Sequence, residues 1–224
     1  MRRAWLALAA LLVLAIVSAS ATLRQAAAAA LPPSPWQDAV RLAHRVSASA
    51  AGLVFLFGVL MSWGGWRRGE RVAGMLLLAC TAVLAVVGRY TVAGAALPVV
   101  LVNLLGGHLL LALLAWLWVR PKTDLATLLP ALAVLGVDAL GAAQGASNLH
   151  AAAGLLVIAW PVMIARRQGA SASRAPRLLI VFLGLAAVVG VLMRTTGGGP
   201  ATAVLHSLLA AFALAAAASL SRRC

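Results

Sequence analysis

Eight long apolar segments follow one another along the chain, separated by short gaps rich in Pro, Gly and Arg. Most of them approach 20 residues, the length of helix that crosses a hydrocarbon core about 30 Å thick. Because backbone groups in lipid must be satisfied within the segment, such runs predict membrane-spanning helices. The sequence therefore predicts an all-α integral membrane protein with eight transmembrane helices. The predicted spans are Ala4–Ala21, Val40–Ser62, Val72–Ala93, Leu97–Val119, Leu125–Ala142, Asn148–Ala165, Leu178–Leu192 and Ala201–Leu220.

The first segment also fits a cleaved signal peptide. Its sequence, MRRAWLALAALLVLAIVSASA, has a basic start, an apolar middle and small residues at its end. It is therefore either a retained helix or a removed leader. In both cases the second span enters from the outer side of the membrane, so the topology of the remaining chain is the same.

The composition agrees with a membrane protein and narrows its chemistry. Of the 224 residues, 64% are hydrophobic and only 10% are charged, against about a quarter charged in soluble domains. The net charge of +14 does not indicate nucleic acid, because the basic residues lie in short loops between apolar segments. The two cysteines form no CxxC pattern, so nothing indicates a thiolate metal site.

The basic residues are divided unequally between the two sides of the membrane. Counted by alternate loops, thirteen of the 18 lysines and arginines fall on one side and five on the other. The positive-inside rule places the richer side, with both chain termini, in the cytoplasm. We therefore expect a multi-pass protein of the cytoplasmic membrane, in contact with lipid. The five on the poorer side are Arg24, Arg41, Arg45, Arg89 and Arg194.

All four histidines fall on even-numbered spans: the second, fourth, sixth and eighth. His150 follows His44 by 106 residues, and His206 follows His108 by 98. The second half thus repeats the first, with one histidine on its second helix and one on its fourth. Such repeats in membrane proteins often carry a binding site at the repeat level. We expect two pseudo-symmetric four-helix bundles, formed by residues 1–122 and 123–224.

An imidazole inside a membrane span is costly unless a partner satisfies it. Two imidazoles on facing helices of a four-helix bundle can coordinate a haem iron from both sides. Zinc fits less well, because it usually takes three or four protein ligands. Gly106 and Gly107, directly before His108, leave room for a flat macrocycle. We therefore expect two bis-histidine haem sites, with His44 and His108 in the first half and His150 and His206 in the second.

The depths of the histidines distinguish the two pairs. His150 and His206 each lie 16 residues before the basic residue that ends their span, which is about 24 Å of helix. For His44 and His108 the corresponding separations are 23 and 12 residues. The second pair is therefore better matched in depth than the first.

Haem carries two propionates, and a guanidinium pairs well with a carboxylate. Arg45 directly follows His44, whereas Arg89 and Arg194 stand at the outer ends of the third and seventh spans. These three arginines are candidates to bind propionates. The alternative is that they only extend to the interfacial water.

Several short motifs occur in an order that is typical of one family. They are HR at 44–45, GRYTV at 88–92, LP at 97–98 followed by His108, MRTTGGGP at 193–200 and LH at 205–206. With eight spans in two halves and two histidines in each, the chain resembles the heme A synthase family over nearly its whole length. The resemblance favours retention of the first span.

The resemblance implies a membrane oxidoreductase that converts heme O to heme A by oxidising a ring methyl group, for cytochrome oxidase biogenesis. His44 and His108 would hold the substrate or product haem. His150 and His206 would hold a haem b cofactor that relays electrons. Heme O synthase, cytochrome oxidase and a quinol electron donor are the partners that it implies.

Two departures from the family leave alternatives open. Many members have glutamate three residues before the first histidine, where this chain has Arg41, and some have a cysteine pair in the first outer loop that is absent here. Asp38 lies about 120° away from His44 around a straight helix. One alternative is a non-catalytic protein that binds haem and hands it on during oxidase assembly, which Arg41 favours. The other is a di-haem b-type electron-transfer cytochrome, which would need haems near opposite membrane faces.

Overall fold

The computed structural model describes residues 2–28, 30–90, 96–120, 125–144, 148–168 and 174–220. Within these ranges the protein is helical and contains no strand, which confirms the all-α prediction. Two short 3-10 turns, η1 (Trp63–Gly65) and η2 (Gly88–Tyr90), accompany the long helices. The long helices are α1 (Arg2–Ala28), α2 (Pro35–Ser62), α3 (Arg68–Val87), α4 (Leu97–Val119), α5 (Leu125–Gln144), α6 (Asn148–Gln168), α7 (Arg174–Thr196) and α8 (Pro200–Ala218).

The helices overlap the predicted apolar segments, but their bounds differ. Helix α3 ends at Val87, six residues before the predicted Ala93, which lies outside the described residues. Helix α2 begins five residues before the predicted Val40, because Pro35 suits the first turn of a helix and follows an extended Ser34. Helix α1 likewise continues beyond Ala21 through the polar residues up to Ala28. Apolar patterning locates the part of a helix inside the membrane and not the polar turns that extend it.

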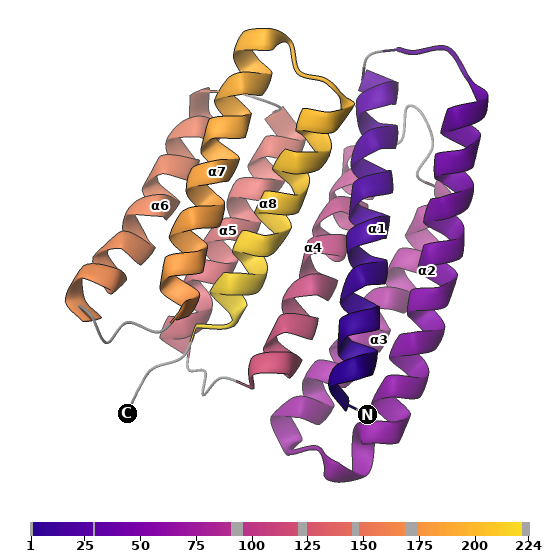
Figure 1. The fold of residues 1–224 in the computed structure, drawn as a ribbon, viewed down its shortest axis with the longest axis vertical. Helices are drawn as coiled ribbons and strands as arrows, with labels where there is room; N and C mark the ends of the chain where they lie inside the picture. The colour runs from indigo at the N-terminus through magenta and orange to yellow at the C-terminus, as the bar shows by residue number, and fades with distance from the viewer. Residues whose placement is uncertain are drawn as a thin grey trace.

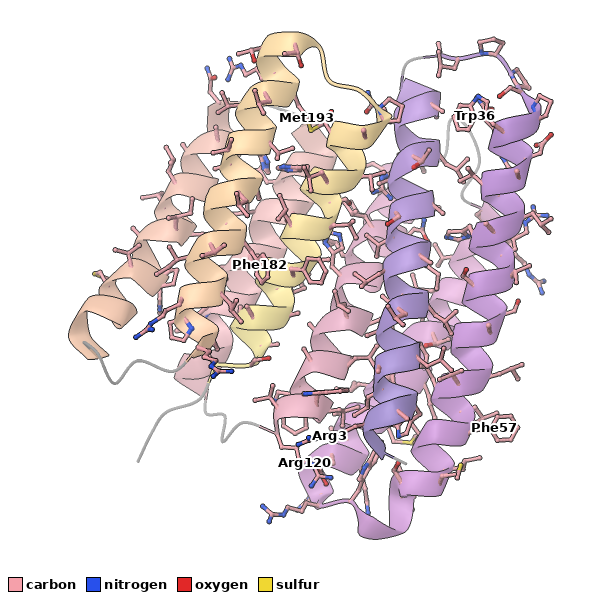
Figure 2. All side chains as sticks on the ribbon, viewed as in Figure 1. Arg3, Trp36, Phe57, Arg120, Phe182 and Met193 are labelled. Atoms are coloured by element: carbon pink, nitrogen blue, oxygen red, sulfur yellow. The ribbon has the colours of Figure 1, made fainter. Side chains whose placement is uncertain are left out.

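Six described helices are long and apolar enough to cross a membrane, namely α1, α2, α3, α4, α7 and α8. In α5 and α6 the corresponding apolar parts are shorter, spanning Leu129–Gly141 and Asn148–Met163. Large apolar side chains cover the outer faces: Leu60 is 61% exposed and Leu156 is 75% exposed. Figure 2 shows Phe57 pointing away from the bundle in the same way. The structure thus supports a multi-pass helical membrane protein with six to eight spans.

The helices form two rings that share a wide contact (Figure 1). In the first ring α1, α2, α3 and α4 contact one another in order, and α4 closes onto α1. Helices α5, α6, α7 and α8 form the second ring in the same way. Helix α8 also packs against α1 and α4, and α4 contacts α5. In each ring the two histidine-bearing helices therefore face each other across a diagonal.

Small residues allow the two rings to approach closely. Ala211 of α8 is fully buried in the apolar cluster of the first ring, and Ala112 of α4 is buried in that of the second. Helix association in membranes relies on this kind of close packing between small side chains. Helix α1 buries Leu6, Val13 and Val17 in the first cluster, so its removal would open the bundle.

Helix α1 begins and α8 ends at the same end of the bundle (Figure 1). Figure 2 places Arg3 and Arg120 at this end and Trp36 and Met193 at the opposite end. Near Arg120, the buried carboxylate of Glu70 accepts a hydrogen bond from the Arg67 backbone N–H at 2.9 Å and forms an ion pair with Arg120. This ion pair connects the start of α3 to the end of α4.

Candidate functional site

His150 of α6 and His206 of α8 are neighbours across the second ring. Their ring centroids are 6.3 Å apart and their planes form an angle of 69°. Two imidazoles that coordinate one metal ion from opposite sides, through bonds of about 2 Å each, have ring centres roughly 6 Å apart. The spacing of this pair therefore fits bis-histidine coordination of a single iron.

Both imidazoles of this pair are oriented by the backbone. The Nδ1 atom of His150 lies 3.1 Å from the Val137 carbonyl of α5, and that of His206 lies 3.0 Å from the Ala186 carbonyl of α7. A carbonyl oxygen can only accept, so each Nδ1 must carry the proton and donate it. For His206 this leaves the Nε2 lone pair for a metal, as in most histidine-ligated sites.

A glycine lies against each of these imidazoles. A Cβ atom added at Gly141 of α5 would come within 2.6 Å of Cε1 of His150. The equivalent atom at Gly190 of α7 would lie 3.4 Å from Cε1 of His206. The backbone of the neighbouring helix thus approaches both rings closely, and at Gly141 no larger residue fits without displacing the ring.

His44 of α2 and His108 of α4 line one small pocket in the first ring. His44 is partly buried, and its imidazole has no hydrogen-bond partner among the described residues. His108 is only 2% exposed. The structure therefore brings the first predicted pair to one cavity, although the two imidazoles differ in burial. The other residues that line the pocket are Ile16, Val17, Ser20, Arg24, Asn103, Leu104 and Gly107.

Asp138 of α5 binds His108 across the boundary between the rings. Its Oδ2 atom lies 2.9 Å from Nδ1 of His108, and the carboxylate is 11% exposed. The other ring nitrogen of His108, Nε2, is buried and has no hydrogen-bond partner. A histidine that donates Nδ1–H to a carboxylate and leaves Nε2 free has the arrangement of a metal ligand with its supporting carboxylate. This unsatisfied atom fits an iron ligand in the pocket.

The two pairs adjoin at α5. Val137 and Asp138 are consecutive residues there, yet the first bonds His150 and the second bonds His108. His206 in turn lies within electrostatic range of both His108 and Asp138. The predicted split into independent halves did not include this link, because His108 draws its partner from beyond residue 122.

Two polar residues of this region escaped the sequence-based prediction of the site. Asp138 lies 30 residues from His108, so no local spacing connects them. The available signal was that an acid inside an apolar span usually faces a polar partner in the bundle interior. Arg24 of α1, which the sequence placed only in an outer loop, lines the pocket of His44 and His108.

The predicted propionate-binding arginines are all exposed; Arg45 lies inside α2, ten residues after its start. Arg45 lies within electrostatic range of His44. Arg194 donates from Nη1 to Oδ1 of Asn148 at 2.7 Å, which joins the end of α7 to the start of α6. Arg89 belongs to η2, at the end of α3. None of them lines the pocket described above, so propionate binding by these residues stays a prediction.

No group of three or more His, Cys, Asp or Glu side chains in the described ranges is arranged to hold a metal ion. A pair of histidines supplies fewer ligands than the three or four that zinc usually takes. No protein-family model and no curated protein sequence matches this chain.

Proposed function

We propose that the protein is a membrane haem protein of the heme A synthase type, which oxidises a haem bound between His44 and His108. In this proposal a haem b lies between His150 and His206. The observation that carries it is the second pair: two imidazoles 6.3 Å apart across a bundle diagonal, both oriented by Nδ1 donation. This geometry supports the proposal, because two imidazoles that held one iron between them would have ring centres about this far apart.

The residues of the second site would hold their group rigidly. The carbonyls of Val137 and Ala186 belong to helix backbones, so they cannot rotate away from the imidazoles. Gly141 lets α5 approach His150 closely. A haem b bound there would supply one-electron redox chemistry. A rigid bis-histidine cage suits a resident electron carrier that is not exchanged.

The residues of the first site suit a haem that enters and leaves. His108 is fixed by Asp138, whereas His44 is partly buried and its imidazole is held by no hydrogen bond among the described residues. One firm ligand and one movable ligand allow exchange more easily than two firm ones. This asymmetry supports the assignment of substrate or product haem, heme O or heme A, to the first half.

A non-catalytic haem carrier is the second candidate, and one observation favours it. Arg41, at the position of the family's glutamate, pairs with Asp38 at 2.8 Å, and the two side chains are 47% and 75% exposed. Neither therefore offers a proton acceptor inside the pocket of His44 and His108. The two proposed functions use the same haem sites. They differ in whether the protein oxidises the haem that it binds.

We also propose that both termini lie in the cytoplasm and that α5 and α6 complete eight spans of the cytoplasmic membrane. The excess of basic residues at the end where α1 begins supports this orientation. Reporter fusions after Ala28, Gln144 and Ala218 should place the first two outside and the last inside. A cytoplasmic reporter at Gln144 would contradict the spanning of α5.

Identification of the haems in the purified protein tests the proposed function. Haem extracted from detergent-solubilised protein should contain haem b together with heme O or heme A, separated by chromatography and identified by mass. Haem b with bound heme O but no conversion favours the carrier. Haem b alone favours a b-type electron-transfer cytochrome, and the absence of haem after supplementation overturns the proposal.

A further inference from the structure

Arg24 brings a charge into the pocket of His44 and His108 from α1. It is partly buried and lies four residues before the end of the helix. Its Nη1 donates to the Ser20 hydroxyl at 2.7 Å, and its Nη2 donates to the Ser207 hydroxyl of α8 at 3.3 Å. The guanidinium thus reaches across the boundary between the rings and is held there by two neutral acceptors.

No carboxylate in the described ranges is left to pair with Arg24. The chain has only four acidic residues. Asp38 pairs with Arg41, Glu70 with Arg120 and Asp138 with His108. The fourth, Asp124, lies outside the described residues. Each described acid is therefore already engaged at another place in the fold.

The side chains that accept hydrogen bonds from Arg24 are neutral hydroxyls. The Asn103 side-chain amide donates to Ser20 at 3.5 Å, so the same hydroxyl accepts from both Arg24 and Asn103. His44, on the other wall of the pocket, lies within electrostatic range of Arg24. A partly desolvated charge without a counter-ion is unfavourable. A carboxylate would offer the guanidinium both a compensating charge and two acceptor oxygens.

We propose that Arg24, assisted by Asn103, binds a carboxylate of the ligand in the pocket of His44 and His108. Given the proposed function, on which this inference rests, that carboxylate is a porphyrin propionate. Arg24 then takes the role that the sequence assigned to Arg45 or Arg89, which are exposed. A partly buried guanidinium discriminates between an acid and its ester better than an exposed one, because water screens it less.

The test compares protoporphyrin IX with its dimethyl ester, with and without iron, on the full-length protein in detergent. His206→Ala removes ligation of the iron porphyrins at the second site, so their binding reports on the first site. For the iron-free porphyrins, dependence on Arg24 identifies the signal of the first site. Iron-free porphyrin binding is followed by quenching of tryptophan fluorescence. We expect the diacid to bind about 10- to 100-fold more tightly than the diester. Arg24→Gln should abolish this preference, and Arg24→Lys should restore part of it.

Arg71→Gln is the matched control, because it removes one positive charge at the opposite end of the bundle, where Arg71 stacks on Trp63. Ser207→Ala removes one contact of Arg24 and keeps its charge, so the preference for the diacid should persist. Size-exclusion profiles identify any variant that fails to fold. In that case Arg24→Lys and the wild-type comparison of diacid with diester still decide the matter.

The outcomes separate the two proposals. Equal binding of diacid and diester, with an intact haem spectrum, overturns the role of Arg24 and leaves the proposed function standing. An acid preference that depends on Arg24, without a bis-histidine spectrum, supports the carboxylate site and overturns the haem assignment. If neither porphyrin binds, both are wrong. Competition by dodecanoate as strong as that by protoporphyrin would assign the site to an acidic lipid and overturn the porphyrin assignment.

Discussion

The two histidine pairs stand on equivalent helices but are supported in different ways. In the second ring each imidazole donates to a backbone carbonyl of a neighbouring helix. In the first ring His108 is bound by the carboxylate of Asp138, which belongs to the second ring, and the imidazole of His44 has no such partner in the described ranges. The repeat in the sequence is therefore not reproduced in the hydrogen bonding of the histidines.

This difference has a physical consequence for any metal bound at each site. A carbonyl is a neutral partner fixed by its helix, whereas a carboxylate carries charge and makes the histidine a stronger base towards the metal. The second site is uniform and rigid. The first has one strongly supported ligand and one weakly supported ligand. We interpret the uniform site as resident and the unequal one as exchangeable.

The largest effect is expected when the uniform site is broken. His206→Ala or His150→Ala should remove the more firmly bound haem, because one imidazole cannot maintain axial ligation from both sides. Absorbance spectra of the purified variants measure the loss. His44→Ala is the control and should leave this haem in place. An unchanged low-spin spectrum in both variants of the second pair would show that these residues are not its ligands.

Asp138→Asn sharpens the comparison by removing the carboxylate that only the first site has. The first haem should bind about 10- to 100-fold more weakly, as is usual when the partner of a ligating histidine is lost. Haem titration, and a shift of the reduction potential of the first haem, measure the change. Asp38→Asn removes an exposed carboxylate and serves as the control. An equal loss of both haems would show that Asp138 supports the two sites together.

A smaller effect separates the two glycines of the second site. Gly141→Ala places a Cβ 2.6 Å from the His150 ring and should destabilise the protein by about 1–3 kcal/mol through overpacking. At Gly190 the corresponding distance is 3.4 Å, and alanine favours a helix by about 0.5–1 kcal/mol over glycine, so Gly190→Ala should be nearly neutral. Thermal unfolding in detergent compares the two variants. Equal stabilities would contradict the close approach of α5 to His150.

The sequence was sufficient to predict the helices, because their signal is local. The length of an apolar run such as Leu97–Val119 can be read directly from the sequence, and α4 has the same bounds. The shared pocket of His44 and His108 and the contact of His150 with His206 were anticipated from the repeat.

The partners of the histidines could not be predicted in the same way. Asp138 reaches His108 only because α4 and α5 meet where the rings adjoin, and this depends on how α8 packs between them. Arg24 looked like an interfacial charge because its position near the end of α1 is all that the sequence gives. Its contact with Ser207, 183 residues away, follows from the packing of α1 against α8. Long-range packing therefore determines the polar shell of the site.

The smallest structural effect is expected at Arg41. The identity of this residue distinguishes the catalytic proposal from the haem-carrier proposal. Its ion pair with Asp38 is exposed, so Arg41→Glu should change stability by no more than about 1 kcal/mol. Three residues before His44, a glutamate would lie about 60° from that histidine around the helix and could accept a proton, which arginine cannot. In a strain that lacks its own heme A synthase, Arg41→Glu should raise the yield of heme A, and Arg41→Gln should not. Full activity of the unmodified protein in that strain would instead show that the first site needs no carboxylate at this position. The two sites would then differ only in how their histidines are held, with His108 bound by the carboxylate of Asp138.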